Sequence, residues 1–187
     1  TQALIGVFIV RLLQPENYGI YALAFSLSGF ITVFMGFGAT SASTTLISEA
    51  YARNDKEKTK EVLGFLAKMT LILVTAVIFG ALIAPQLGEI FYNNYRIGIY
   101  AAILLIATAF GSTFFPFTLI ALQITRRIKT MTVLAFSNQF SKSILSLLLV
   151  LAGFGVWGAI TGHLLGSIFI MVASIILWGS VNKQNPV

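Results

Sequence analysis

The polar side chain with the most unusual place in this sequence is Lys142, a cation inside a long apolar run. In a helix that begins near Met131, it lies about 16 Å along the axis. Asn138 and Ser146 lie four residues before and after it, so the three side chains share one helix face. An ammonium group flanked by an amide and a hydroxyl can bind a phosphate or pyrophosphate. We therefore take Lys142, Asn138 and Ser146 as candidate substrate-binding residues. A structural lysine, bonded to helix-end carbonyls or paired with an acid from a missing half of the protein, is the alternative.

Two further side chains are candidates for binding or proton transfer. Arg11 lies at the exterior end of the first apolar run, where its planar fork of donors could guide a phosphate. An anchor at the membrane interface is the alternative. His163 lies in the last apolar run between Gly162 and Gly166 and could couple proton movement to transport. For His163 the alternative is a hydrogen bond to a neighbouring helix.

The residue inventory does not suggest catalysis. The sequence contains no cysteine and one histidine, so a thiolate site is excluded and a zinc site lacks companion ligands. No GxSxG motif accompanies the serines. We expect no catalytic residue, no metal and no cofactor, and therefore a protein that is not an enzyme.

Composition indicates an integral membrane protein. Hydrophobic residues make up 57% of the chain and charged residues 10%, whereas a soluble domain has about 25% charged residues. The net charge of +6 does not predict nucleic-acid binding, because the basic residues lie mostly in gaps between apolar runs.

The apolar runs predict a bundle of six transmembrane helices. A helix needs about 20 apolar residues to cross the hydrocarbon layer, and all but the first run meet that length. The predicted spans are residues 2–13, 18–48, 62–84, 97–122, 131–151 and 156–179. Since the first run is truncated, we expect the chain to begin inside a helix and to be a fragment. The fold class expected is all-α integral membrane.

The basic residues also predict an orientation. They gather after the second, fourth and sixth spans, and cytoplasmic loops are enriched in Lys and Arg. The loops near 49–61 and 123–130 and the carboxy terminus are therefore predicted to be cytoplasmic. Arg126, Arg127 and Lys129 can attract anionic lipid headgroups there. The turn at residues 11–19 is predicted to lie outside.

Local patterns predict several structural details. Asn54 can cap a helix whose third residue is Glu57. Glu49 and Arg53 lie four residues apart and can form a solvated ion pair.

Two patterns concern the shape and packing of the later spans. Pro116 should bend the fourth span, because it removes a backbone hydrogen bond. Gly158, Gly162 and Gly166 share one face of the sixth span and should let another helix approach closely.

Three stretches of the chain resemble a known family. The first begins at Arg11, Leu12 and Leu13, continues through Pro15, Glu16, Tyr18, Gly19, Tyr21 and Ala22, and leads to Phe37 and Gly38. The others are residues 48–63 and 153–166. Together they resemble the polysaccharide biosynthesis proteins, flippases of the multidrug/oligosaccharidyl-lipid/polysaccharide exporter superfamily. Ser43, Thr44 and Thr45 depart from the pattern, since many members carry a basic residue there.

The resemblance implies a fold and an activity. The six helices would be the amino-terminal lobe of a MATE-like transporter, which works by rocking one bundle against another. Its substrate would be a polyprenyl-pyrophosphate-linked oligosaccharide such as an O-antigen unit of lipopolysaccharide, moved across the cytoplasmic membrane and passed to polysaccharide polymerase machinery. A cation-coupled drug exporter of the same superfamily and a membrane scaffold that transports nothing are the alternatives.

Overall fold

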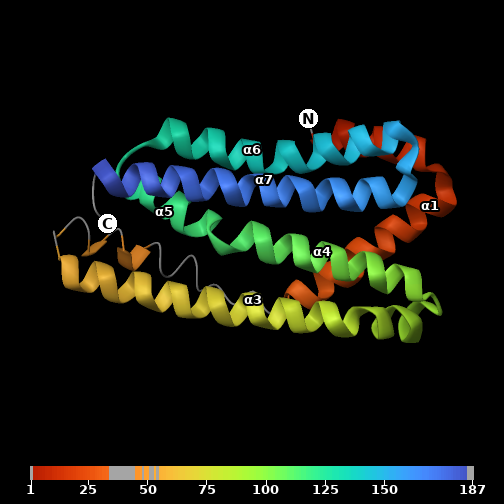
Figure 1. The fold of residues 1–187 in the computed structure, drawn as a ribbon, viewed down its shortest axis with the longest axis horizontal. Helices are drawn as coiled ribbons and strands as arrows, with labels where there is room; N and C mark the ends of the chain where they lie inside the picture. The colour runs from red at the N-terminus through yellow and green to blue at the C-terminus, as the bar shows by residue number, and fades with distance from the viewer. Residues whose placement is uncertain (1, 34–44, 48, 51–52, 54, 185–187) are drawn as a thin grey trace.

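The computed structural model describes residues 2–33, 45–47, 49–50, 53 and 55–184, and Figure 1 shows their arrangement. The longer elements in this part of the chain are all helices, and no strand occurs among the described residues. The helices are α1 (Gln2–Val33), α3 (Lys56–Tyr92), α4 (Tyr95–Thr113), α5 (Phe115–Ile124), α6 (Ile128–Leu149), the π-helix η1 (Val150–Phe154) and α7 (Gly155–Gln184).

Three helical stretches are long and apolar enough to cross a membrane, namely Glu57–Tyr92, Tyr95–Ile124 and Ile128–Val181. The third stretch folds back on itself, because α6 and α7 lie side by side (Figure 1). Side chains on the outer faces are apolar and exposed, as with Leu71 and Leu82, each 67% exposed. The all-helical class is thus confirmed for the described residues, which include helices able to span a membrane, while the count of six spans and the MATE-like lobe stay predictions.

The predicted turn at residues 11–19 is a kink inside α1 instead. Gln14 has φ 65° and ψ 159°, and helix continues on both sides of it. The residue before a proline is sterically disfavoured in the helical conformation, whereas proline itself suits the first turn of a helix. Gln14 therefore leaves the helix and Pro15 starts a new segment, so that α1 changes direction sharply (Figure 1). Residues 34–44, the middle of the predicted second span, lie outside the described residues.

The start of α3 corrects one predicted cap. The N-cap is Asp55, whose Oδ1 accepts a hydrogen bond from the backbone N–H of Lys58 at 2.9 Å. Asn54, the predicted cap, lies outside the described residues. Asp and Asn cap equally well, so the pattern left a shift of one residue open. The predicted pair is confirmed, since Arg53 Nη2 lies 2.7 Å from Glu49 Oε1.

Helices α3 and α4 form a hairpin with a much shorter loop than predicted. Residues 85–96 were expected to connect two spans, but α3 continues to Tyr92 and α4 begins at Tyr95. Asn93 closes α3 in the left-handed conformation (φ 48°), and Asn94 Oδ1 accepts from the N–H of Arg96 at 3.1 Å. Pro85 is tolerated inside α3 because packing against a neighbouring helix offsets the lost hydrogen bond.

Glycines bring α3 and α4 into contact. A Cβ on Gly88 would lie 2.7 Å from Gly98 Cα, and one on Gly98 would lie 2.5 Å from Pro85 Cα. Backbone atoms at that distance leave no room for a side chain, so the two helices touch through their main chains. This pair of glycines was not predicted from the sequence.

The predicted bend near Pro116 is confirmed. Helix α4 ends at Thr113, Phe114 is the junction, and Pro116 lies in the first turn of α5. Thr118 Oγ1 donates to Phe114 O at 3.1 Å and to Ser174 O at 3.0 Å. The second bond ties α5 to α7 just beyond the bend.

Helices α6 and α7 form a second hairpin through η1. Gly153 (φ 90°) and Gly155 (φ 54°) take backbone conformations that other residues disfavour, so the chain reverses there. A Cβ on Gly162 would lie 2.6 Å from Leu145 C, and one on Gly166 would lie 2.6 Å from Lys142 Cα. The close helix approach predicted from the glycine spacing is therefore confirmed.

Helix α4 lies between α3, its partner in the first hairpin, and α7 of the second hairpin. Helix α1 packs across these helices (Figure 1). One core cluster joins Leu13 of α1, Leu104 of α4 and Ile160 of α7. A second joins Leu27 of α1, Ala81 of α3 and Leu105 of α4. The fold thus places α1, α6 and α7 around one another, which matters for the site described next.

The predicted orientation can be tested with single cysteines, since the sequence has none of its own. Cysteines replacing Asn17 and Ala152, both exposed, are expected to react with an impermeant thiol reagent in intact cells. Cysteines replacing Gln123 and Thr130 are expected to react only after permeabilisation, because the basic loops should face the cytoplasm. If the two pairs of cysteines exchanged their labelling patterns, the predicted orientation would be wrong.

Candidate functional site

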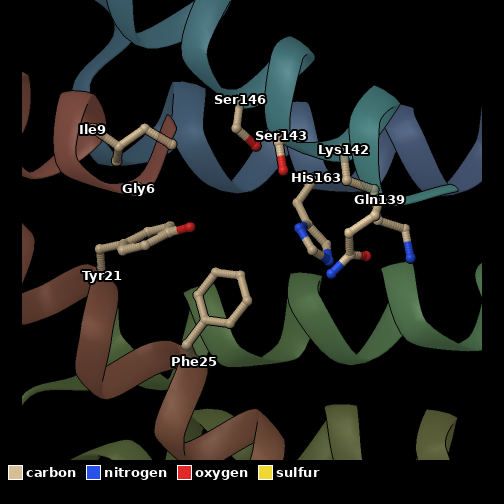
Figure 2. Close-up of a pocket in the computed structure, with 9 residues that line it drawn as sticks. All are labelled: Gly6, Ile9, Tyr21, Phe25, Gln139, Lys142, Ser143, Ser146 and His163. Carbon is tan, nitrogen blue, oxygen red and sulfur yellow. The ribbon is translucent and has the colours of Figure 1, made fainter. Parts of the chain in front are cut away.

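A polar pocket of about 150 Å³ lies where α1, α6 and α7 meet. Helix α6 contributes four polar side chains to its lining, Gln139, Lys142, Ser143 and Ser146, and α7 contributes His163. Helix α1 supplies Gly6, Ile9, Tyr21 and Phe25. Figure 2 shows Tyr21 and Phe25 on one side of the space and the polar α6 and α7 side chains on the other. Polar groups therefore converge here in an otherwise apolar bundle.

Lys142 is partly buried in this pocket and reaches toward α4. A Cβ added to Gly111 of α4 would lie 3.3 Å from Lys142 Nζ and 3.7 Å from Ser167 Oγ. The missing side chain at Gly111 thus leaves the room that the ammonium group occupies. Within the described part of the chain, no carboxylate lies within ion-pair distance of Lys142.

The two candidate residues next to Lys142 on α6 differ in their surroundings. Ser146 is buried and donates to Ala159 O of α7 at 2.6 Å, so its proton serves the helix contact. Asn138 is not among the pocket-lining residues, and its Oδ1 is buried without a hydrogen-bond partner in the described residues. Ser167 Oγ is likewise buried without a hydrogen-bond partner in the described residues. Of the three predicted α6 residues, Lys142 and Ser146 therefore line the pocket and Asn138 does not.

His163 meets an aromatic side chain rather than a polar one. Its ring lies 5.3 Å from that of Phe25 at an interplanar angle of 86°, which is an edge-to-face contact. Phe25 in turn lies 4.8 Å from Tyr21. No hydrogen bond to the imidazole is found within the described parts of the chain. In Figure 2 the imidazole and the Tyr21 hydroxyl both extend into the space, where a polar ligand could meet them.

Arg11 lies apart from this pocket. It is exposed on α1, three residues before the kink at Gln14, and is not among the pocket-lining residues. The structure thus does not bring Arg11 together with Lys142. Its position near the end of the first α1 segment fits the interface anchor better than a contact inside the pocket.

Six lining residues were not predicted as site residues, and two of them, Tyr21 and Phe25, are aromatic. Their signal is the spacing of Tyr18, Tyr21 and Phe25, which puts three aromatic rings on one face of a helix. Aromatic residues at such spacing more often build a core, so the pattern alone could not assign them to a pocket. Which face of α1 meets α6 depends on the kink at Gln14.

The chemistry available in the pocket is recognition of an anion with polar substituents. Lys142 offers a positive charge, Gln139 and Ser143 offer neutral donors and acceptors, and Tyr21 offers a hydroxyl. A cation in a poorly hydrated site attracts a phosphate more strongly than it would in water. No cluster of three metal-binding side chains occurs in the described residues.

A family model described as polysaccharide biosynthesis protein matches residues 8–183, which is nearly the whole chain. No curated protein and no solved structure matches the chain. The matched range includes α6, all of α7 except its last residue, and all of the pocket except Gly6. The chain therefore belongs to the polysaccharide biosynthesis protein family.

Proposed function

We propose that the protein moves a polyprenyl-pyrophosphate-linked oligosaccharide across the cytoplasmic membrane during export of a cell-surface polysaccharide. Family membership supports a role in polysaccharide export, and the apolar helices support a place in the membrane. The polar pocket would hold the sugar-phosphate headgroup while the polyprenyl chain stays in the lipid. Movement would follow from rocking of this helical lobe against a second one.

One observation carries the proposal, namely the partly buried Lys142 in a pocket to which no described residue brings a carboxylate. A lysine at mid-membrane depth costs about 3 kcal/mol on insertion scales, and such residues mostly face a cavity or a partner. Lys142 lies about 21 Å along α6, a helix about 33 Å long. An anionic ligand that arrives during transport would offset the insertion cost.

The lining also bears on the choice of cargo. A cation-coupled exporter for positively charged drugs would be served by carboxylates in the membrane. Glu16 and Glu89 are exposed near the ends of helical segments, and neither lines the pocket. The pocket is therefore better suited to an anionic cargo. We infer that the protein transports its cargo without chemical change, since the pocket lining lacks a paired nucleophile and base.

A direct transport assay tests the proposal. The complete protein would be reconstituted in liposomes with a fluorescent polyprenyl pyrophosphate linked to a sugar. We expect an impermeant reductant to bleach label from both leaflets with the protein and from the outer leaflet alone without it. A lipid with the same chain and sugar joined through an uncharged ether serves as the control and should move more slowly.

Two outcomes would count against the proposal. If the pyrophosphate-linked lipid does not move, the protein is not a flippase for this class, and a scaffold role gains support. If the uncharged lipid moves equally fast, the charge of Lys142 plays no part in selecting the cargo.

A further inference from the structure

A second cavity, an apolar groove of about 340 Å³, lies between α3, the α4–α5 junction and α7. Leu71 and Val74 of α3 form one wall, Phe114 and Phe117 form another, and Trp178 of α7 closes the end. Trp178 is held edge-to-face against Phe117 at a ring distance of 6.3 Å and an angle of 80°. The groove is lined almost wholly by apolar side chains, so it is suited to a hydrocarbon chain.

The groove is separate from the polar pocket. The two share no lining residue, and His163 and Trp178 lie about 22 Å apart along α7. The groove faces the lipid, since Leu71 in its wall is 67% exposed. Its occupant therefore enters from the bilayer rather than from the site of the sugar headgroup.

A positive charge lies at the proper distance for a lipid headgroup. Lys60 is exposed on α3, seven residues before the lining residue Ala67, and so lies two turns away on the same helix face. The distance along the axis is about 10 Å. The first turns of α3 are predicted to be cytoplasmic, where a lysine can reach the headgroups of the inner leaflet.

We propose that this groove binds one acyl chain of an anionic phospholipid from the cytoplasmic leaflet, with the phosphate held near Lys60. Thr113 and Phe114 lie at the end of α4, and Phe117 lies in α5, so the chain would contact both sides of the bend. A bound lipid would therefore stabilise the bent form of α4–α5. The site concerns the membrane's own lipid, and it can fail without affecting the transport proposal.

Trp178 allows the occupant to be detected directly. The sequence has two tryptophans, Trp157 and Trp178, so the Trp157→Phe protein reports on Trp178. The complete protein in this background would be placed in phosphatidylcholine bilayers that contain a minor fraction of brominated lipid. A protein that carries both Trp157→Phe and Trp178→Phe gives the background fluorescence, which is subtracted from the signal of the Trp157→Phe protein.

We expect brominated phosphatidylglycerol to quench Trp178 at about fivefold lower mole fraction than brominated phosphatidylcholine, because one lysine attracts one negative headgroup. Lys60→Gln should remove this preference. Lys58→Gln is the matched control, since Lys58 is also exposed but lies on the opposite face of α3, and it should keep the preference.

Three results would overturn the proposal that the groove binds an anionic phospholipid. Equal quenching by the two lipids shows that no anionic lipid is selected. Loss of the preference in both lysine variants shows a general surface charge instead of a site. Absence of quenching by either lipid shows that no chain enters the groove.

Discussion

Replacing Lys142 with Met is expected to abolish polysaccharide export while the protein accumulates in the membrane at its normal level. Methionine keeps the length of the side chain and removes its charge, so the attraction for a pyrophosphate is lost. The insertion cost of about 3 kcal/mol also disappears, which favours a stable protein. Export would be measured as surface polymer in a strain that depends on the plasmid-borne protein, and membrane abundance by immunoblot.

Two further substitutions at Lys142 separate charge from shape. Lys142→Gln keeps a polar group without charge and is expected to export little. Lys142→Arg keeps the charge but is larger, and the 3.3 Å between Nζ and the Cβ position of Gly111 leaves little room for it. Partial export is expected for this variant. Lys129→Met, at an exposed position on the same helix, is the matched control and should export normally.

The outcome can also refute the role of Lys142. Normal export by the Met variant at normal abundance would rule out a contact between this lysine and the cargo. Failure of all three variants to accumulate would instead assign Lys142 a structural role.

Gly162→Val is expected to destabilise the α6–α7 hairpin severely. A Cβ at this position meets the backbone N and Cα of Ser146 and lies 2.6 Å from Leu145 C. Since these are backbone atoms, the whole of α6 must move away, and the 2.6 Å hydrogen bond from Ser146 to Ala159 is lost. Overpacking costs about 1–3 kcal/mol in general and more where the backbone must shift.

The measurement is the melting temperature of the detergent-purified protein, followed by size-exclusion chromatography after heating. Gly179→Val is the matched control, because Gly179 also lies on α7 and a Cβ there has nothing within 4 Å. A clear fall in melting temperature is expected for Gly162→Val alone. Equal behaviour of the two variants would contradict the close approach of α6 and α7.

Features that depend on a single helix could be predicted from the sequence. The spacing of Gly158, Gly162 and Gly166 marks one face of α7 whatever its partner is, and that face does meet α6. Pro116 removes a hydrogen bond in any helix, and the break at Phe114 follows. In the same way, the burial of Lys142 follows from its place in an apolar run.

The features that were missed depend on where segments meet. Gly88 and Gly98 pair only because the turn at Asn93 and Asn94 is short, and the predicted loop of 85–96 was too long for that pairing. Tyr21 and Phe25 line the pocket because the kink at Gln14 directs the second part of α1 past His163. Such long-range geometry is not contained in the periodicity of a single segment.

The two tight turns also bear on the order in which the chain assembles during synthesis. In α3–α4 and in α6–α7, the closest backbone contacts join glycines to residues a short distance away in sequence. Contacts of short separation form early, because little chain entropy is lost in closing the loop. Each hairpin can therefore form as soon as its second helix has entered the membrane. Helix α1 is made before its partners α6 and α7, and the α3–α4 hairpin is made between them. The polar pocket, whose walls come from α1, α6 and α7, can therefore be completed only after the α3–α4 hairpin has been made.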